Sequence, residues 1–166
     1  LRRVLESIGE PLPAEEVQLD ACHGRTLAGD IAALRTQPPF AVSAMDGYAV
    51  HAADVTTPPA RLRVIGSSIA WRGFRNSVAP GEAVRIFTGA PLPEGADSIV
   101  IQEDVDAEGE RVTLREPARP GRHVRKAGLD FEEGATLLRA GRRLDASRLA
   151  LAAAMGHGRL PVRRRP

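Results

Sequence analysis

Glycines that follow proline or glutamate recur from residue 60 onward, and this spacing limits the fold more than any other feature. They stand at 81, 95, 109, 121 and 134. Short apolar stretches follow most of them, at 84–87, 98–101, 112–114 and 135–138. Short strands joined by turns at nearly even spacing are typical of a small β-barrel or sandwich. The residues between the glycines are not alike, so we interpret the pattern as successive hairpins and not as a repeat.

The two ends of the chain have a different pattern. Apolar residues at helical spacing predict an amphipathic helix over 1–8, and alternating residues predict strands over 15–19 and 26–33. Near the other end, Asp145 is a suitable N-cap for a helix over 146–155, and a closing strand is expected over 159–162.

We therefore predict an α+β fold that is mostly β and has two lobes. The first is a discontinuous lobe of helices and strands, formed by residues 1–39 and 132–166. The second is an inserted β-barrel-like lobe over 40–131. A chain of 166 residues is long enough for two small domains.

Composition excludes several classes of protein. The chain is 43% hydrophobic and 27% charged, which is ordinary for a soluble protein, and no apolar run approaches the ~18 residues of a membrane span. The single cysteine, Cys22, excludes an internal disulfide and fits a reducing cytoplasm. The net charge is only +2 and both signs are interspersed, apart from the arginines at 163–165. We expect a cytoplasmic protein with no membrane or nucleic-acid partner.

The stretch from Ser43 to Val50 is the strongest candidate for a site. Asp46-Gly47 predicts a tight turn in which the glycine takes a positive φ, and Tyr48 begins a strand. A carboxylate held at a rigid corner suits metal binding or substrate orientation. The alternative is an aspartate that only caps its own turn, and the local pattern by itself favours that alternative.

Two further stretches offer groups that bind anions. Thr88 supplies a hydroxyl after a predicted strand, and the amides near Gly89 and Ala90 can form an anion-binding nest or simply a rigid connection. Arg125 and Asp130 can hold an anionic ligand and its metal, or form a surface ion pair of little energetic value.

Other chemistries find no support in the sequence. The four histidines at 23, 51, 123 and 157 are too far apart for metal-ligand spacing. The chain contains neither a phosphate-binding G-x-x-x-x-G-K-[ST] loop nor a G-x-S-x-G nucleophile motif. We expect no covalent catalysis.

Three motifs together resemble a known family. They are SAMDGYAV after a Pro-Pro-Phe lead, RIFTGAPLPEGADSIVIQED, and GRHVRKAGLDFEEGATLLRAGRRL. Their order resembles that of the molybdopterin molybdenumtransferase (MoeA) family, which includes the C-terminal domain of gephyrin. The resemblance covers essentially the whole chain and implies the N-terminal region, domains I and II. Family members continue into a C-terminal pterin-binding domain that is missing here, so we expect this chain alone to be inactive.

The resemblance implies an enzyme that inserts molybdenum from molybdate into adenylylated molybdopterin with the help of Mg²⁺. It also implies a homodimer in which the active cleft pairs this region with the pterin-binding domain of the other subunit. By resemblance, Asp46 and Thr88 are catalytic, and Arg125, Asp130 and Gly89 bind substrate. Asp46 and Asp130 are the expected metal ligands. With these matches, a functional role for Asp46 is favoured over a purely structural one.

The chain also departs from the family pattern. Ala41 and Val42 replace an Asp-Asn pair before the first motif, Leu129 replaces a glutamate, and His123 replaces an asparagine. The loss of polar groups near Asp46 and Asp130 weakens the hydrogen bonding that orients them. The alternative function is therefore a non-catalytic dimerisation scaffold with the same fold.

Overall fold

The computed structural model describes residues 9–166, so the predicted helix over 1–8 lies outside the described residues. The chain divides into two compact units. Unit 1 combines Leu1–Gln37 with Asp130–Pro166, and unit 2 is Pro38–Leu129. That each lobe is an independent domain stays a prediction.

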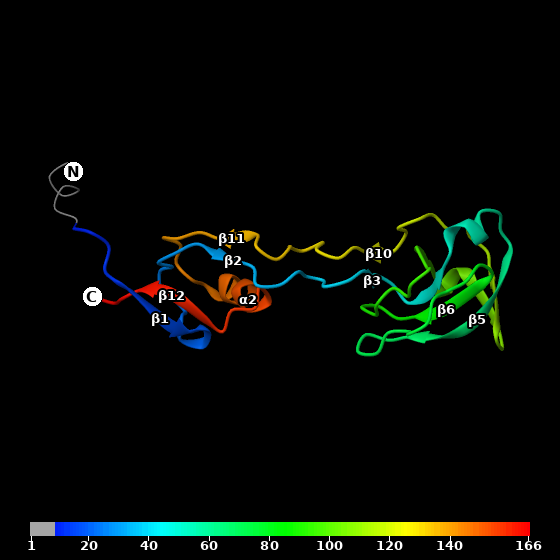
Figure 1. Cartoon of the computed structure of the whole chain (residues 1–166), viewed down its shortest axis with the longest axis horizontal. Coiled ribbons are helices and arrows are strands. Elements are labelled where there is room, and N and C mark those ends of the chain that lie inside the picture. The colour runs from blue at the N-terminus through cyan, green and yellow to red at the C-terminus, as the bar shows by residue number, and fades with distance from the viewer. Residues whose placement is uncertain (1–8) are drawn as a thin grey trace. The chain divides into compact units, whose positions relative to one another are not determined.

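Unit 1 is closed by strands from opposite ends of the chain. Strand β1 (Ala14–Gln18) pairs antiparallel with β12 (Arg159–Arg163), as Figure 1 shows, and a short 3-10 turn, η1 (Leu19–Ala21), follows β1. Strand β2 (Ile31–Ala32) pairs antiparallel with β11 (Thr136–Leu138). These pairings join the two parts of unit 1 through backbone hydrogen bonds.

The strand predicted over 26–33 is wrong for most of its length. Only β2 forms there, while Thr26 and Leu27 make isolated bridges. The chain bends at Ala28 and Gly29. The Asp30 carboxylate then accepts a hydrogen bond from the Ala140 amide (2.8 Å), an alternative to a continuous ladder.

The helix α2 (Ala146–Ala154) covers the core of unit 1. Asp145 is its N-cap, as predicted, and accepts a hydrogen bond from the Arg148 amide at 2.9 Å. Apolar residues from both parts of the unit form this core: Cys22, Leu27, Ile31, Ala33, Phe131, Leu138, Leu144, Ala152, Met155, Leu160 and Val162. Among residues 9–166, no helix has the length and apolar character needed to cross a bilayer.

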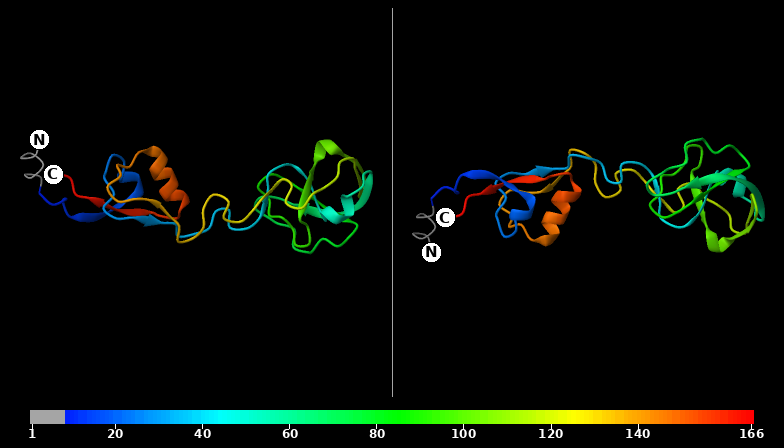
Figure 2. Two further views of the ribbon diagram at one scale, coloured as in Figure 1. Left: turned by 90° about the horizontal axis from the view of Figure 1, so that it is seen from above. Right: turned by 90° about the horizontal axis from the view of Figure 1, so that it is seen from below.

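Unit 2 is built on a six-stranded sheet that curls into a half-barrel (Figure 2). Its strand order is β7-β4-β6-β5-β9-β8. The strands are β4 (Gly47–Val50), β5 (Ala60–Ser68), β6 (Glu82–Ile86), β7 (Ser98–Ile101), β8 (Val105–Glu108) and β9 (Arg111–Leu114). Strands β5 and β6 are parallel, and the other neighbours are antiparallel. The predicted mostly β fold is confirmed.

Smaller elements complete unit 2. Strands β3 (Val42–Ser43) and β10 (Val124–Arg125) form an antiparallel pair, and two 3-10 turns follow strands of the main sheet. These turns are η2 (Ala52–Val55) and η3 (Gln102–Asp104). The β3–β10 pair leads directly into the corner at Asp46.

Strand β4 lies inside the sheet, and all four of its residues are buried. Tyr48 and Val50 join one apolar cluster, whereas Ala49 joins the other. Successive side chains of a strand point to opposite faces, so both faces of β4 are covered. This burial fixes the strand that follows Asp46.

The glycines that defined the hairpin pattern behave as predicted, but Gly47 does not. All five, at 81, 95, 109, 121 and 134, have positive φ. Gly47 instead begins β4, outside the left-handed region, so the positive φ predicted there is wrong. A Cβ on Gly47 would lie only 2.1 Å from the carbonyl oxygen of Val100 on β7. Glycine is needed because two strands approach closely, not because of the turn.

Gly47→Ala is expected to destabilise the chain by about 2–3 kcal/mol, because the new methyl group forces β4 and β7 apart. Urea denaturation followed by circular dichroism measures this change. Gly158→Ala is the matched control, since Gly158 also lacks a positive φ and a Cβ added there would have no atom within 4 Å. Equal losses for the two variants would contradict the steric explanation.

Candidate functional site

The carboxylate of Asp46 is held by both hydrogen-bond donors of Thr88. Asp46 Oδ1 accepts from the Thr88 amide at 2.7 Å and from the Thr88 hydroxyl at 2.8 Å. These bonds, with the backbone bond the stronger, lower the pKa of Asp46 below its ordinary value, and the charge of Arg85 adds a smaller effect. Asp46 is therefore ionised at neutral pH. Its partner lies on another strand's loop, so it does more than cap its own turn.

The backbone around Asp46 is fixed by two neighbouring segments and by a bond within the corner. The Asp46 carbonyl accepts from the Gln102 amide at 3.1 Å, and the Ala44 amide donates to the His123 carbonyl at 2.9 Å. Within the corner, the buried Ser43 hydroxyl accepts from the Met45 amide at 3.2 Å. The corner is thus rigid, as its sequence predicted.

Arg85 links the two sides of this corner. Its Nη1 donates to the Gly47 carbonyl at 3.0 Å, and its Nη2 donates to Gln102 Oε1 at 2.5 Å. The guanidinium carbon lies 5.1 Å from the Tyr48 ring centroid and 4.8 Å from that of Phe87, within range of a cation–π contact. The positive charge is thereby held near Asp46.

Sequence reasoning missed Arg85 and Gln102. Arg85 lies three residues before Thr88, inside a motif that the sequence singled out, but its partners come from β4 and from η3, the turn after β7. Arg85 can be identified from its pairing with Tyr48 across the sheet. That pairing can be predicted only when the register between β4 and β6 is known.

The loop after β6 forms a rigid connection and not an anion-binding nest, the two alternatives that the sequence left open. The Gly89 amide donates to the Ser43 carbonyl and the Ala90 amide to the Phe87 carbonyl, both at 2.9 Å. The Thr88 amide is bonded to Asp46. All three amides are already satisfied within the chain, so of the two alternatives for this loop the structure agrees with the rigid connection and not with the anion-binding nest. Gly89 is exposed with φ of +80°, and a Cβ there would meet only Ala70, at 3.9 Å.

Arg125 and Asp130, which the sequence predicts as a pair that could hold an anionic ligand and its metal, belong to different units. Arg125 is exposed at the end of β10, opposite Val42 of β3, on the strand beside the one that leads to Asp46. Asp130 belongs to unit 1, where its amide donates to the Gln37 carbonyl at 3.0 Å. Within unit 2 the structure therefore associates Arg125, but not Asp130, with the strands around the corner.

The departures from the family pattern leave the corner intact. The Ala41 carbonyl accepts from the Leu92 amide at 2.9 Å, and Val42 forms a backbone bridge with Pro91. Both contacts use main-chain atoms that any side chain leaves in place. His123 has φ of +57°, a conformation that asparagine and histidine both adopt more readily than most residues.

Asp46 can offer one carboxylate oxygen to a magnesium ion. The hydrogen bonds from Thr88 engage Oδ1, which leaves Oδ2 for a cation. Within the described range 9–166, no three side chains of His, Cys, Asp and Glu gather as a metal site. Magnesium commonly takes one or two carboxylates and completes its shell with water and phosphate oxygens, so the donor set fits a substrate-dependent ion.

A curled β-sheet unit inserted into a discontinuous unit is the architecture that this chain shares with solved MoeA structures. The chain belongs to the MoeA family: residues 1–156 match the family profile described as "MoeA N-terminal region (domain I and II)".

Individual relatives agree with this assignment. The chain is 42% identical over 150 residues to molybdopterin molybdenumtransferase 2 of Mycobacterium tuberculosis H37Rv, covering 88% of this chain and 37% of the relative. It is 40% identical over 157 residues to the molybdopterin molybdenumtransferase of Synechococcus elongatus, covering 92% and 39%. The crystal structure of the MoeA protein from Pyrococcus horikoshii OT3 matches with a TM-score of 0.94 at 34% identity, over 100% of this chain and 45% of that one. The chain spans less than half the length of these relatives.

Thr88→Val is expected to raise the pKa of Asp46, though not to its ordinary value, because the amide bond remains. Carboxyl ¹³C NMR titration measures this shift. A carboxylate with a lowered folded-state pKa stabilises above its unfolded pKa, and that stability is lost as the pH falls through the folded value. The stability gap between wild type and Thr88→Val should therefore be widest at neutral pH and narrow below about pH 4.

Thr113→Val on β9 is the control, because the Thr113 hydroxyl bonds no carboxylate among the residues described. Its stability difference should not change with pH in this range. An unchanged Asp46 titration in Thr88→Val would contradict the assigned hydrogen bond.

Proposed function

We propose that this chain is the N-terminal part of an enzyme that inserts molybdenum from molybdate into adenylylated molybdopterin. The observation that supports this proposal most directly is the ionised Asp46 carboxylate, which both hydrogen-bond donors of Thr88 orient. Relatives that are 40–42% identical are named molybdopterin molybdenumtransferases, which supports the reaction class.

The proposed roles follow from the chemistry of each group. Thr88 positions Asp46, and Asp46 orients the metal or the substrate through Oδ2. Arg125 is exposed and attracts the oxygens of molybdate or of a nucleotide phosphate. Gly89 lets a ligand approach the backbone where a side chain would stand. These roles require only positioning and charge stabilisation, with no covalent step on the protein.

Asp46 and Asp130 are the proposed ligands for Mg²⁺, the second by resemblance alone. Magnesium supplies positive charge that neutralises phosphate and molybdate oxygens. The rest of the cleft is proposed to come from the pterin-binding domain of a second subunit in a cytoplasmic homodimer. The length of the relatives supports a further domain, since this chain spans 37–45% of them.

The alternative of a non-catalytic scaffold is not favoured. It rested on Ala41, Val42 and Leu129 in place of polar residues. At the first two positions the corner is maintained by main-chain contacts, and Asp46 keeps its partner.

Asp46→Asn in the full-length protein should lower the rate of molybdenum insertion by about 10²–10³-fold, because it removes the charge while preserving the size of the side chain and an acceptor for Thr88. Molybdenum bound to the pterin product, measured by mass spectrometry, reports the rate. Asp30→Asn is the matched control: Asp30 also has a lowered pKa from a backbone amide and a side-chain donor, but it lies in unit 1. Full activity in Asp46→Asn would refute the role of this carboxylate.

A further inference from the structure

The connection between β5 and β6 carries a groove that the proposed reaction does not use. Its volume is 460 Å³, within the range of about 300–1,000 Å³ typical of small-ligand sites. Six residues line it: Ser67, Arg72, Gly73, Phe74, Arg75 and Asn76. None of these is acidic, and none belongs to the Asp46 corner.

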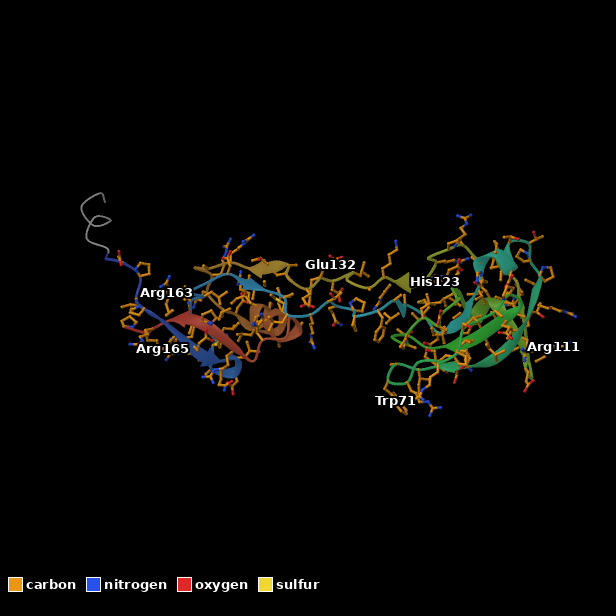
Figure 3. The ribbon with its side chains drawn as sticks, viewed as in Figure 1. Trp71, Arg111, His123, Glu132, Arg163 and Arg165 are labelled. Atoms are coloured by element: carbon orange, nitrogen blue, oxygen red, sulfur yellow. The ribbon has the colours of Figure 1, made fainter. Side chains whose placement is uncertain are left out.

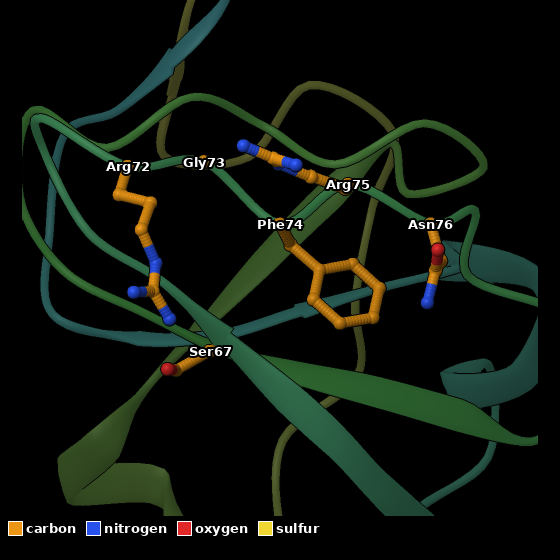
Figure 4. A pocket seen from close by; sticks show the side chains of 6 residues that line it. All are labelled: Ser67, Arg72, Gly73, Phe74, Arg75 and Asn76. Carbon is orange, nitrogen blue, oxygen red and sulfur yellow. The ribbon is translucent and has the colours of Figure 1, made fainter.

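Two exposed arginines give the groove its charge. Within the described part of the chain, the guanidinium groups of Arg72 and Arg75 make no hydrogen bond or ion pair. Figure 4 shows the Arg72 side chain extending toward Ser67, with Arg75 and Asn76 farther along the same loop. Two guanidinium groups with nearby hydroxyl and amide donors are a set that suits an oxyanion.

The loop that carries these arginines is anchored to the sheet. Ile69 and Arg72 exchange backbone hydrogen bonds of 3.1 and 3.0 Å. A Cβ on Gly73 would lie 3.2 Å from Pro91 Cγ, and one on Gly66 only 2.6 Å from the Phe74 ring. The backbone below the arginines is therefore held in place, which lowers the entropy lost when a ligand binds.

We propose that this groove binds the phosphate oxyanion of a small ligand, as a second site in unit 2. The inference rests on the lining residues and is independent of the proposed molybdenum insertion. The ligand is either inorganic (pyro)phosphate or a phosphate ester with a planar ring. Trp71 does not line the groove, but it is 82% exposed and directly precedes the lining residue Arg72, and the proposal assigns to it the ring contact of the second kind.

Trp71 also provides the experiment, since it is the only tryptophan of the chain. Titration of the 166-residue chain with pyrophosphate should change Trp71 fluorescence in a saturable way. Arg72→Gln and Arg75→Gln should each weaken binding by about tenfold, and the double variant should abolish it. The control is Arg111→Gln, an exposed arginine of β9 that lies at the other end of unit 2 from Trp71 (Figure 3).

Calorimetry with ADP and pyrophosphate distinguishes the two sources. If the chain binds ADP more tightly than pyrophosphate, and Trp71→Ala lowers the ADP affinity to the pyrophosphate value, the ligand is a ring-bearing ester. If the chain binds ADP and pyrophosphate with equal affinity, the ligand is free phosphate. Either result supports an oxyanion site when it depends on Arg72 and Arg75. Absence of binding by both methods at millimolar ligand, or equal weakening by Arg111→Gln, would overturn the proposal.

Discussion

The two hydrogen bonds from Thr88 to Asp46 depend on the register between β4 and β6. Gly47 pairs with Ile86 in this antiparallel ladder, so the residues just outside the pair, Asp46 and Phe87, lie at the same edge. Thr88 follows directly, and both of its donors reach the carboxylate. A slip of one residue would turn these side chains to opposite faces of the sheet. The close approach of β7 at Gly47 fixes the other side of β4, so the position of the acid follows from packing across three strands.

A positive charge, that of Arg85, lies near Asp46 without forming an ion pair with it. Arg85 is near enough to lower the pKa of Asp46, but its hydrogen bonds go to the Gly47 carbonyl and to Gln102, and its planar group packs against Tyr48 and Phe87. A direct ion pair would engage the carboxylate that a metal or substrate needs. The hydrogen bonds from Thr88 keep Asp46 ionised, and because Arg85 is bonded elsewhere, the carboxylate keeps one oxygen available.

Local chemistry was sufficient to predict several of the elements from the sequence, but not the longest strand, β5. The cap at Asp145, the turns at the five glycines and the strand over 98–101 each depend on residues a few positions apart. Predictions failed where distant segments decide the outcome. The bend before β2 involves a hydrogen bond from the Ala140 amide to the Asp30 carboxylate. After β6, bonds to Asp46 and Ser43 decide between the nest and the rigid connection that the sequence left open. Arg85 was missed for the same reason, since its role depends on β4. The motifs indicated Asp46 and Thr88, but only the register explains why they meet.

An ionised carboxylate is at first sight a poor partner for molybdate and phosphate, because all three are negative. Like charges held close together repel, and one of them must then be protonated or paired with a cation. The hydrogen bonds from Thr88 exclude the first solution, since they favour the charged form of Asp46. In the proposed function, a cation between this acid and an anionic substrate offsets the repulsion. Magnesium, which takes few protein oxygens and completes its shell with substrate oxygens, suits the role proposed for that cation, and the exposed Arg125 is the positive charge proposed to assist it from the neighbouring pair of strands.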